Sequence, residues 1–192
     1  NEGKASVRGS MFCATLASFG FVVLSPDPVS QGERYQFKDY TTNYDSVSGH
    51  NMVGKKLIAL NEYFGSFRAF DAVRALDCLL SFDEVDSNEV YVAGCSGGGT
   101  LTSFMAALDD RLKGAMPSCY ITTWLNNVEN ELAADAEQIP PNLASLGLDM
   151  GDFLIASAPN YVLILDEKND FFDVRGTVKT YSEVKKIYSL LG

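Results

Sequence analysis

The residues of this sequence whose types and spacing could do chemistry are Gly94-Cys95-Ser96-Gly97-Gly98, a G-x-S-x-G pattern. The pattern follows a β-branched and aromatic stretch, Glu89–Ala93, and precedes a helical pattern that opens at Leu101. A serine on a sharp strand-to-helix turn holds its hydroxyl above the sheet, where it can attack a carbonyl carbon. We therefore expect Ser96 to be a nucleophile. The N–H of Gly97, at the helix N-terminus, is expected to stabilise the oxyanion.

The glycines on either side of Ser96 have a steric reason. A positive φ at the serine brings its backbone close to the strand and the helix, so we expect that no Cβ fits at Gly94 or Gly98. Other glycine-rich loops do not match, because a dinucleotide loop needs glycine at position 96 and a Walker A loop needs a lysine. The remaining alternative is an ordinary turn with a spectator serine. Cys95 is disfavoured as the nucleophile because the residue before the serine normally points into packing.

A serine nucleophile needs a base to take its proton and a carboxylate to orient that base. Asp170 lies five residues after an apolar run, Tyr161–Leu165, and is the candidate acid. Asp173 is the runner-up, and either residue could instead be a helix cap. The single histidine, His50, precedes Ser96 in a polar stretch. For His50 we expect a structural hydrogen bond or a substrate contact rather than the role of general base.

The elements that must position these residues alternate along the chain. This alternation predicts an α/β fold, a mostly parallel sheet with helices on both faces, in a single domain over residues 1–192. A polar loop is expected over residues 30–54, and residues 121–160 carry no strand pattern. The predicted strands are Phe21–Leu24, Glu89–Ala93, Gly114–Met116 and Tyr161–Leu165, and the predicted helices are 5–18, 67–80, 101–108 and 177–191.

Composition excludes some classes of partner. The formal charge of −10 argues against nucleic acid and anionic membranes, which a polyanion would repel. No apolar run approaches the roughly 20 residues of a membrane span. The four cysteines show no metal-ligand spacing, so no metal site is predicted, and buried free thiols are expected.

Together these residues resemble the α/β-hydrolase superfamily, and more narrowly its acetyl xylan esterase-like branch, near the dienelactone hydrolase and prolyl oligopeptidase groups. The resemblance implies that Ser96 is the nucleophile, Asp170 the triad acid and Gly97 an oxyanion donor, with no cofactor. It also implies strands upstream of residue 1, and a last strand and a catalytic histidine downstream of residue 192. The sheet would then be incomplete at both ends, and the chain alone would hydrolyse esters poorly. Besides Gly94–Thr100, the segments that carry the resemblance are Gln31–Arg34, Arg68–Asp71, Arg74–Asp77, Pro117–Tyr120 and Asp170–Asp173.

The implied reaction is removal of a small acyl group, such as acetyl, from a carbohydrate ester. Residues 121–160 would form a lid-like insertion. Tyr120 and Trp124 would either stack on a sugar or pack the lid onto the sheet. Asp135 and Glu137 could bond sugar hydroxyls, but a solvated acidic face is the expectation for them. A prolyl oligopeptidase-like peptidase and a non-catalytic binding domain remain alternatives. The compartment stays open, although a secreted or periplasmic protein would fit the resemblance.

Overall fold

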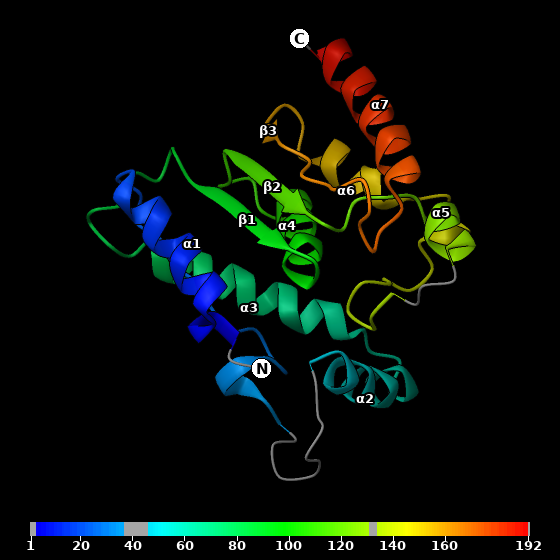
Figure 1. Ribbon diagram of the computed structural model, residues 1–192, viewed down its shortest axis with the longest axis horizontal. Helices are drawn as coiled ribbons and strands as arrows, with labels where there is room; N and C mark the ends of the chain where they lie inside the picture. The colour runs from blue at the N-terminus through cyan, green and yellow to red at the C-terminus, as the bar shows by residue number, and fades with distance from the viewer. Residues whose placement is uncertain (1–2, 37–45, 131–133, 192) are drawn as a thin grey trace. The chain divides into compact units, whose positions relative to one another are not determined.

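The computed structural model describes residues 3–36, 46–130 and 134–191. It divides into two compact units, residues 1–86 and 87–192. Each unit is described here by itself (Figure 1).

The first unit is built from helices. Helix α1 (Val7–Ser18) begins at Ser6, whose hydroxyl accepts a hydrogen bond from the Gly9 N–H, and α3 spans Phe64–Leu79. The helices predicted at 5–18 and 67–80 are therefore confirmed. The predicted loop over 30–54 is wrong from residue 46 onward, where α2 (Ser46–Ala59) begins, and its residues 37–45 lie outside the described residues. Two short 3-10 helices complete the unit, η1 (Gly3–Ala5) and η2 (Gly32–Arg34).

The strand predicted at Phe21–Leu24 does not form. These residues have no strand geometry, and Phe21, Val22 and Leu24 are exposed. A strand is stable only when its N–H and C=O groups pair with a neighbouring strand. No strand occurs among the described residues of this unit, so the apolar run lacks a partner.

Two of the motifs quoted above meet in the first unit. The Arg34 guanidinium lies 2.5 Å from the Asp71 carboxylate, which also accepts a hydrogen bond from the Val29 N–H at 2.8 Å. The Arg68 guanidinium donates to the Gln31 side chain at 3.1 Å. Side chains of α3 thus anchor the loop around η2.

The second unit contains the sheet. Strands β1 (Tyr91–Cys95), β2 (Gly114–Ser118) and β3 (Tyr161–Val162) are parallel and lie in that order (Figure 1). The ladder continues beyond β3, because the Leu163 and Leu165 N–H groups donate to β2 carbonyls at 3.0 Å. The prediction of a parallel sheet in an α/β fold is confirmed.

Helix α4 (Gly97–Leu108) follows β1 directly and packs against both β1 and β2. Helix α6 (Met150–Ala156) packs against α4, and α7 (Val174–Leu191) packs against α6. The segment 121–160 carries α5 (Trp124–Glu129), η3 (Ala144–Leu146) and α6, and its described residues form no strand, as predicted. Its residues 131–133 lie outside the described part.

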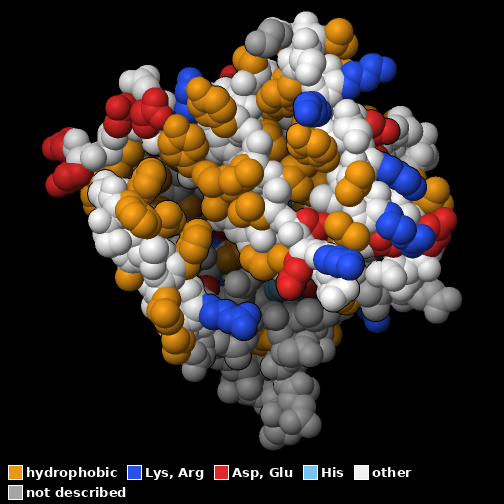
Figure 2. Space-filling view, turned by 45° about the horizontal axis from the view of Figure 1, so that its top comes forward, with side chains coloured by type: hydrophobic (Ala, Val, Ile, Leu, Met, Phe, Trp, Pro, Cys, Tyr) orange, Lys and Arg blue, Asp and Glu red, His pale blue; other side chains and the backbone are white. Residues whose placement is uncertain are grey.

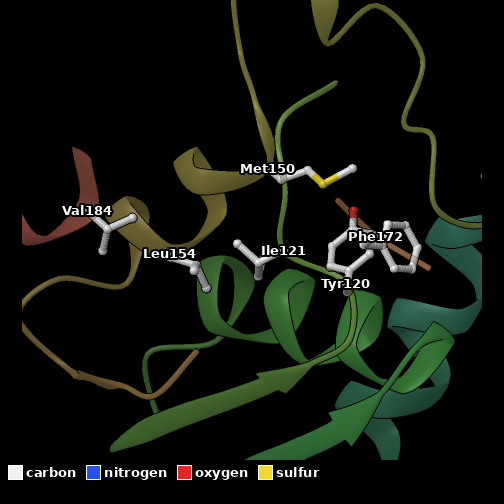
Figure 3. Close-up of a cluster of buried hydrophobic side chains, with 6 residues drawn as sticks. All are labelled: Tyr120, Ile121, Met150, Leu154, Phe172 and Val184. Atoms are coloured by element: carbon white, nitrogen blue, oxygen red, sulfur yellow. The ribbon is translucent and has the colours of Figure 1, made fainter. Parts of the chain in front are cut away.

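The core of this unit lies where the segment after β2 meets α6 and α7. Figure 3 shows its buried side chains converging from these segments and from the loop after β3. The ring of Tyr120 meets that of Phe172 edge-on, with 5.6 Å between centroids. Burial of such side chains stabilises the unit by roughly 1.5–3 kcal/mol each. The cluster consists of Tyr120, Ile121, Met150, Leu154, Phe172 and Val184.

Large apolar side chains also lie at the surface (Figure 2). On β3 and the residues after it, Tyr161, Leu163 and Leu165 alternate outward and are exposed. A groove of about 560 Å³ runs along residues 159–164 and one side of α7. In the described parts of the chain, no helix combines the length and apolarity needed to cross a membrane.

Candidate active site

The carboxyl ends of the three strands place chemically active residues along one edge. Ser96 follows β1, Cys119 follows β2, and Asp166 follows Leu165. The hydrogen-bond ladder runs into this edge: the Ser96 N–H donates to the Ser118 carbonyl, and the Cys119 N–H donates to the Leu165 carbonyl, both at 2.9 Å. Ligands of open parallel sheets bind at this edge.

Ser96 stands on a sharp bend between β1 and α4. Its φ is 58° and its ψ is −119°, a conformation rare for a residue with a side chain. Its carbonyl accepts the Thr100 N–H at 2.9 Å, as an N-cap residue should. Gly97 is the first residue of α4, where backbone N–H groups have no acceptor within the helix. The geometry is that of a nucleophile elbow with a helix N-terminus beside it.

The steric reasoning about glycine holds at one flanking position and is wrong at the other. A Cβ on Gly94 would lie 2.4 Å from the carbonyl oxygen of Gly98, whereas a Cβ on Gly98 would meet nothing within 4 Å. The second crowded position is Gly99, where a Cβ would lie 2.4 Å from the Ser118 carbonyl oxygen. The motif alone does not predict this crowding, because the neighbour of Gly99 is on β2 rather than within the motif.

Asp170 lies in the loop after β3, at the same edge as Ser96. Its carboxylate accepts the Phe172 N–H at 3.2 Å and interacts with Asp166 and with the thiol of Cys119. Burial raises the pKa of Asp166, the Asp170 carboxylate adds to the rise, and a hydrogen bond from the Thr177 hydroxyl works against it. The loop therefore holds a pair of interacting carboxyl groups, of which the sequence analysis singled out one.

Asp173, the runner-up acid, is engaged elsewhere. Its carboxylate forms an ion pair with Arg175 at 2.5 Å and accepts the Arg175 N–H at 2.8 Å, directly at the start of α7. The Arg175 guanidinium lowers the pKa of Asp173. This is the helix-cap role considered above, so the structure favours Asp170 as the candidate acid.

His50 makes a structural hydrogen bond, which is one of the two roles predicted for it. It is 4% exposed, lies in α2 of the first unit, and its Nε2 is 3.0 Å from an Arg68 guanidinium nitrogen. Since arginine only donates, Nε2 is the acceptor in this contact. Its ring also contacts Phe64 at 5.6 Å between centroids.

Tyr120 packs in the core rather than facing a ligand. It is 0% exposed, its hydroxyl donates to the Gln138 carbonyl at 3.3 Å, and burial raises its pKa. Trp124 is half-buried against the same core, with its backbone N–H bonded to the Asp149 carboxylate at 2.9 Å. The geometry of Tyr120 favours the packing alternative. A sugar contact by Trp124 stays a prediction.

Two expectations about burial are wrong. Asp135 and Glu137 are buried rather than part of a solvated face, and Asp135 uses its carboxylate to accept the Ala136 N–H at 2.8 Å. The four cysteines are free, as expected, but none is buried. Cys78 and Cys95 are exposed, and Cys13 and Cys119 are half-buried. Small neighbours in the sequence therefore did not imply a buried thiol.

The parallel sheet with its covering helices has the fold of the α/β-hydrolases. Residues 9–135 match the acetyl xylan esterase family (AXE1), and the chain belongs to that family. The matched segment includes Ser96 and ends before Asp170.

Relatives of this chain include an acetyl esterase and a protein described as a hydrolase. It is 36% identical over 77 residues to acetyl esterase Axe7A of Xylanibacter ruminicola, covering 40% of this chain and 17% of that protein. It is 25% identical over 118 residues to a Bacillus subtilis protein described as hydrolase YtaP. That match covers 62% of this chain and 36% of the Bacillus protein.

Solved structures with this fold include a Bacteroides fragilis protein described as an acetyl xylan esterase. That structure gives a TM-score of 0.70 at 15% identity and covers 93% of this chain and 46% of its own. A glucuronoyl esterase of carbohydrate esterase family 15 from Caldicellulosiruptor kristjansonii gives a TM-score of 0.56 at 17% identity. The match covers 86% of this chain and 48% of that one. The chain thus spans less than half the length of each of these relatives.

Proposed function

We propose that this chain carries the nucleophile of a carboxylic-ester hydrolase that removes acetyl groups from carbohydrate. The observation that carries the proposal is Ser96 at φ 58°, between a parallel strand and a helix N-terminus, in a member of the acetyl xylan esterase family. Acetyl esters of sugars are the substrate class that the family name and the Axe7A relative support.

The reaction has two displacements. The Ser96 oxygen bonds to the acetyl carbon while the ester C–O bond breaks, and the sugar oxygen leaves with a proton. Water then attacks the acetyl-enzyme, the Ser96–acetyl bond breaks, and acetate leaves. The Gly97 N–H would donate to the oxyanion in both steps, and Asp170 would orient the general base. His50 is not assigned as that base, because its Nε2 is held by Arg68.

The test uses a fluorophosphonate probe followed by substrate assays. We expect the probe to label the full-length protein on Ser96 and to leave its S96A variant unlabelled. The matched control is Ser182→Ala, an exposed serine of α7 whose hydroxyl bonds the Val178 carbonyl, and it should label like wild type. Removal of a serine nucleophile costs on the order of 10⁶ in kcat in a well-studied protease, so hydrolysis of an aryl acetate by S96A should fall to background.

Three results would contradict the proposal. Labelling that persists in S96A would place the nucleophile elsewhere. No labelling of the folded full-length protein would favour the binding-domain alternative. Cleavage of proline-peptide reporters in preference to aryl acetates would favour the peptidase alternative.

A further inference from the structure

Two of the free thiols lie at the base of the nucleophile turn. Cys95 is the last residue of β1 and is exposed, whereas Cys119 follows β2 and is half-buried. In the register of the sheet, Cys95 is paired with Ser118, the residue before Cys119. The two cysteines are therefore diagonal neighbours on adjacent strands.

The backbone turns both thiols toward the same side. Paired residues of parallel strands project from the same face, so Cys95 and Ser118 share a face. In a regular strand Cys119 would point to the opposite face, but its φ of 52° breaks the alternation. The Cys119 sulfur lies 3.5 Å from the Ser118 hydroxyl, which places it on the side of Ser118.

The spacing fits a disulfide bond. A strand separation of about 4.8 Å and a rise of about 3.3 Å per residue put diagonal Cα atoms about 6 Å apart. Disulfide bonds in proteins join Cα atoms roughly 4.4–6.8 Å apart. The Cys95 thiol is also close enough to Cys119 to contribute to the pKa of that group. That pKa is raised to about 12: a hydrogen bond with Ser118 lowers it, but Asp170, burial and Cys95 outweigh this.

From this arrangement we infer that Cys95 and Cys119 form a reversible disulfide under a peroxide oxidant, and that the bond slows acylation of Ser96. The Cys95 thiolate attacks one oxygen of hydrogen peroxide, which gives a sulfenic acid and, after protonation, water. The Cys119 thiol then attacks the Cys95 sulfur, the S–O bond of the sulfenic acid breaks, and the sulfenic oxygen takes the thiol proton and leaves as a second water. The two thiols are oxidised by two electrons, and the peroxide is reduced.

The consequence for Ser96 rests on the proposed function. The new bond would tie the residue before Ser96 to the residue after β2, and would take the Cys119 sulfur out of its contact with Asp170. A displacement near 1 Å can cost about 100-fold in rate, so we expect at least about tenfold slower fluorophosphonate labelling of the oxidised chain. Dithiothreitol should restore the rate.

The experiment treats the full chain with hydrogen peroxide, blocks remaining thiols with N-ethylmaleimide and digests it with an Asp-specific protease without reductant. Cleavage before aspartate separates the cysteines, since residues 86–108 contain Cys95 and residues 110–134 contain Cys119. We expect these two peptides linked, with two hydrogens fewer than their sum. The link should be absent in C95S and C119S and present in the matched control C78S.

Cys95 oxidised to sulfinic acid without a link, a link to Cys78, or a link between two chains would overturn the disulfide. A disulfide that leaves the labelling rate unchanged would overturn the effect on Ser96. Both outcomes are distinct from failure of the proposed function, because the S96A chain should still form the linked peptides.

Discussion

The contrast among the glycines around Ser96 gives the sharpest test of this structure. A Cβ on Gly94 would meet the carbonyl oxygen and carbon of Gly98 at 2.4 and 2.6 Å, and a Cβ on Gly99 would meet the Ser118 carbonyl oxygen at 2.4 Å. These neighbours are backbone atoms, which cannot rotate away as a flexible side chain can. A Cβ on Gly98 would meet nothing within 4 Å.

The expected magnitudes follow from these contacts. Overpacking of this kind costs about 1–3 kcal/mol, and each 1 kcal/mol shifts the Tm of a chain this long by about 2–4 °C. G94A and G99A should therefore lower the Tm by about 2–12 °C. G98A replaces a helical glycine without a clash, gains about 0.5–1 kcal/mol, and should raise the Tm by about 1–4 °C.

Thermal unfolding followed by far-UV circular dichroism measures all three variants against wild type. The variants differ by the same added methyl group within six residues, so composition and charge are matched. A G98A chain that loses as much stability as G94A would refute the reasoning, because the crowding would then not be specific to Gly94 and Gly99.

Two further predictions concern one side chain in each unit, Arg68 in the first and Asp166 in the second. Arg68→Ala removes a buried guanidinium that contacts a backbone carbonyl and two side chains. In a urea titration it should therefore lower the free energy of unfolding by more than about 2 kcal/mol. The exposed control Arg74→Ala should change that free energy by less than about 1 kcal/mol. Equal losses would mean that the buried hydrogen bonds do not anchor the loop around η2. The folded-state pKa of Asp166 is raised above 3.8, so the folded chain holds that proton more tightly and its stability falls as the pH rises through the interval that starts near 3.8. D166N should thus have a higher Tm than wild type at neutral pH and lose this advantage near pH 3, and a difference in Tm that is independent of pH would contradict the shift.

The sequence predicted the elements whose determinants are local. The turn at Ser96, the helices α1, α3 and α7, and the parallel strands β1 and β2 follow from patterns within a few residues. Phe21–Leu24 was predicted as a strand on the same kind of pattern, and it failed because strand formation depends on a partner that no local pattern supplies. Helix α2 was missed because the stretch before residue 54 is polar and carries no apolar periodicity.

The sequence pattern points to one candidate nucleophile but to several candidate acids, and the reason is steric. The elbow constrains consecutive residues through backbone contacts, such as the approach of Gly94 to Gly98, so the sequence itself records the geometry. The acid has no such signature, because a carboxylate at any of three loop positions could reach the edge. Only the partners separate these positions: Arg175 holds Asp173 at the start of α7, and Thr177 bonds Asp166.

Asp170 differs from both of these carboxylates. Its carboxylate accepts a hydrogen bond from the Phe172 N–H and interacts with Asp166 and with the Cys119 thiol. A triad acid must accept a hydrogen bond from the base while its own position is fixed by the backbone. A carboxylate that is already paired with an arginine is poorly suited to stabilise an imidazolium, because the arginine balances its negative charge. By this criterion Asp170 is the acid we would assign, and Cys119, whose thiol it contacts, is the group through which oxidation would reach it.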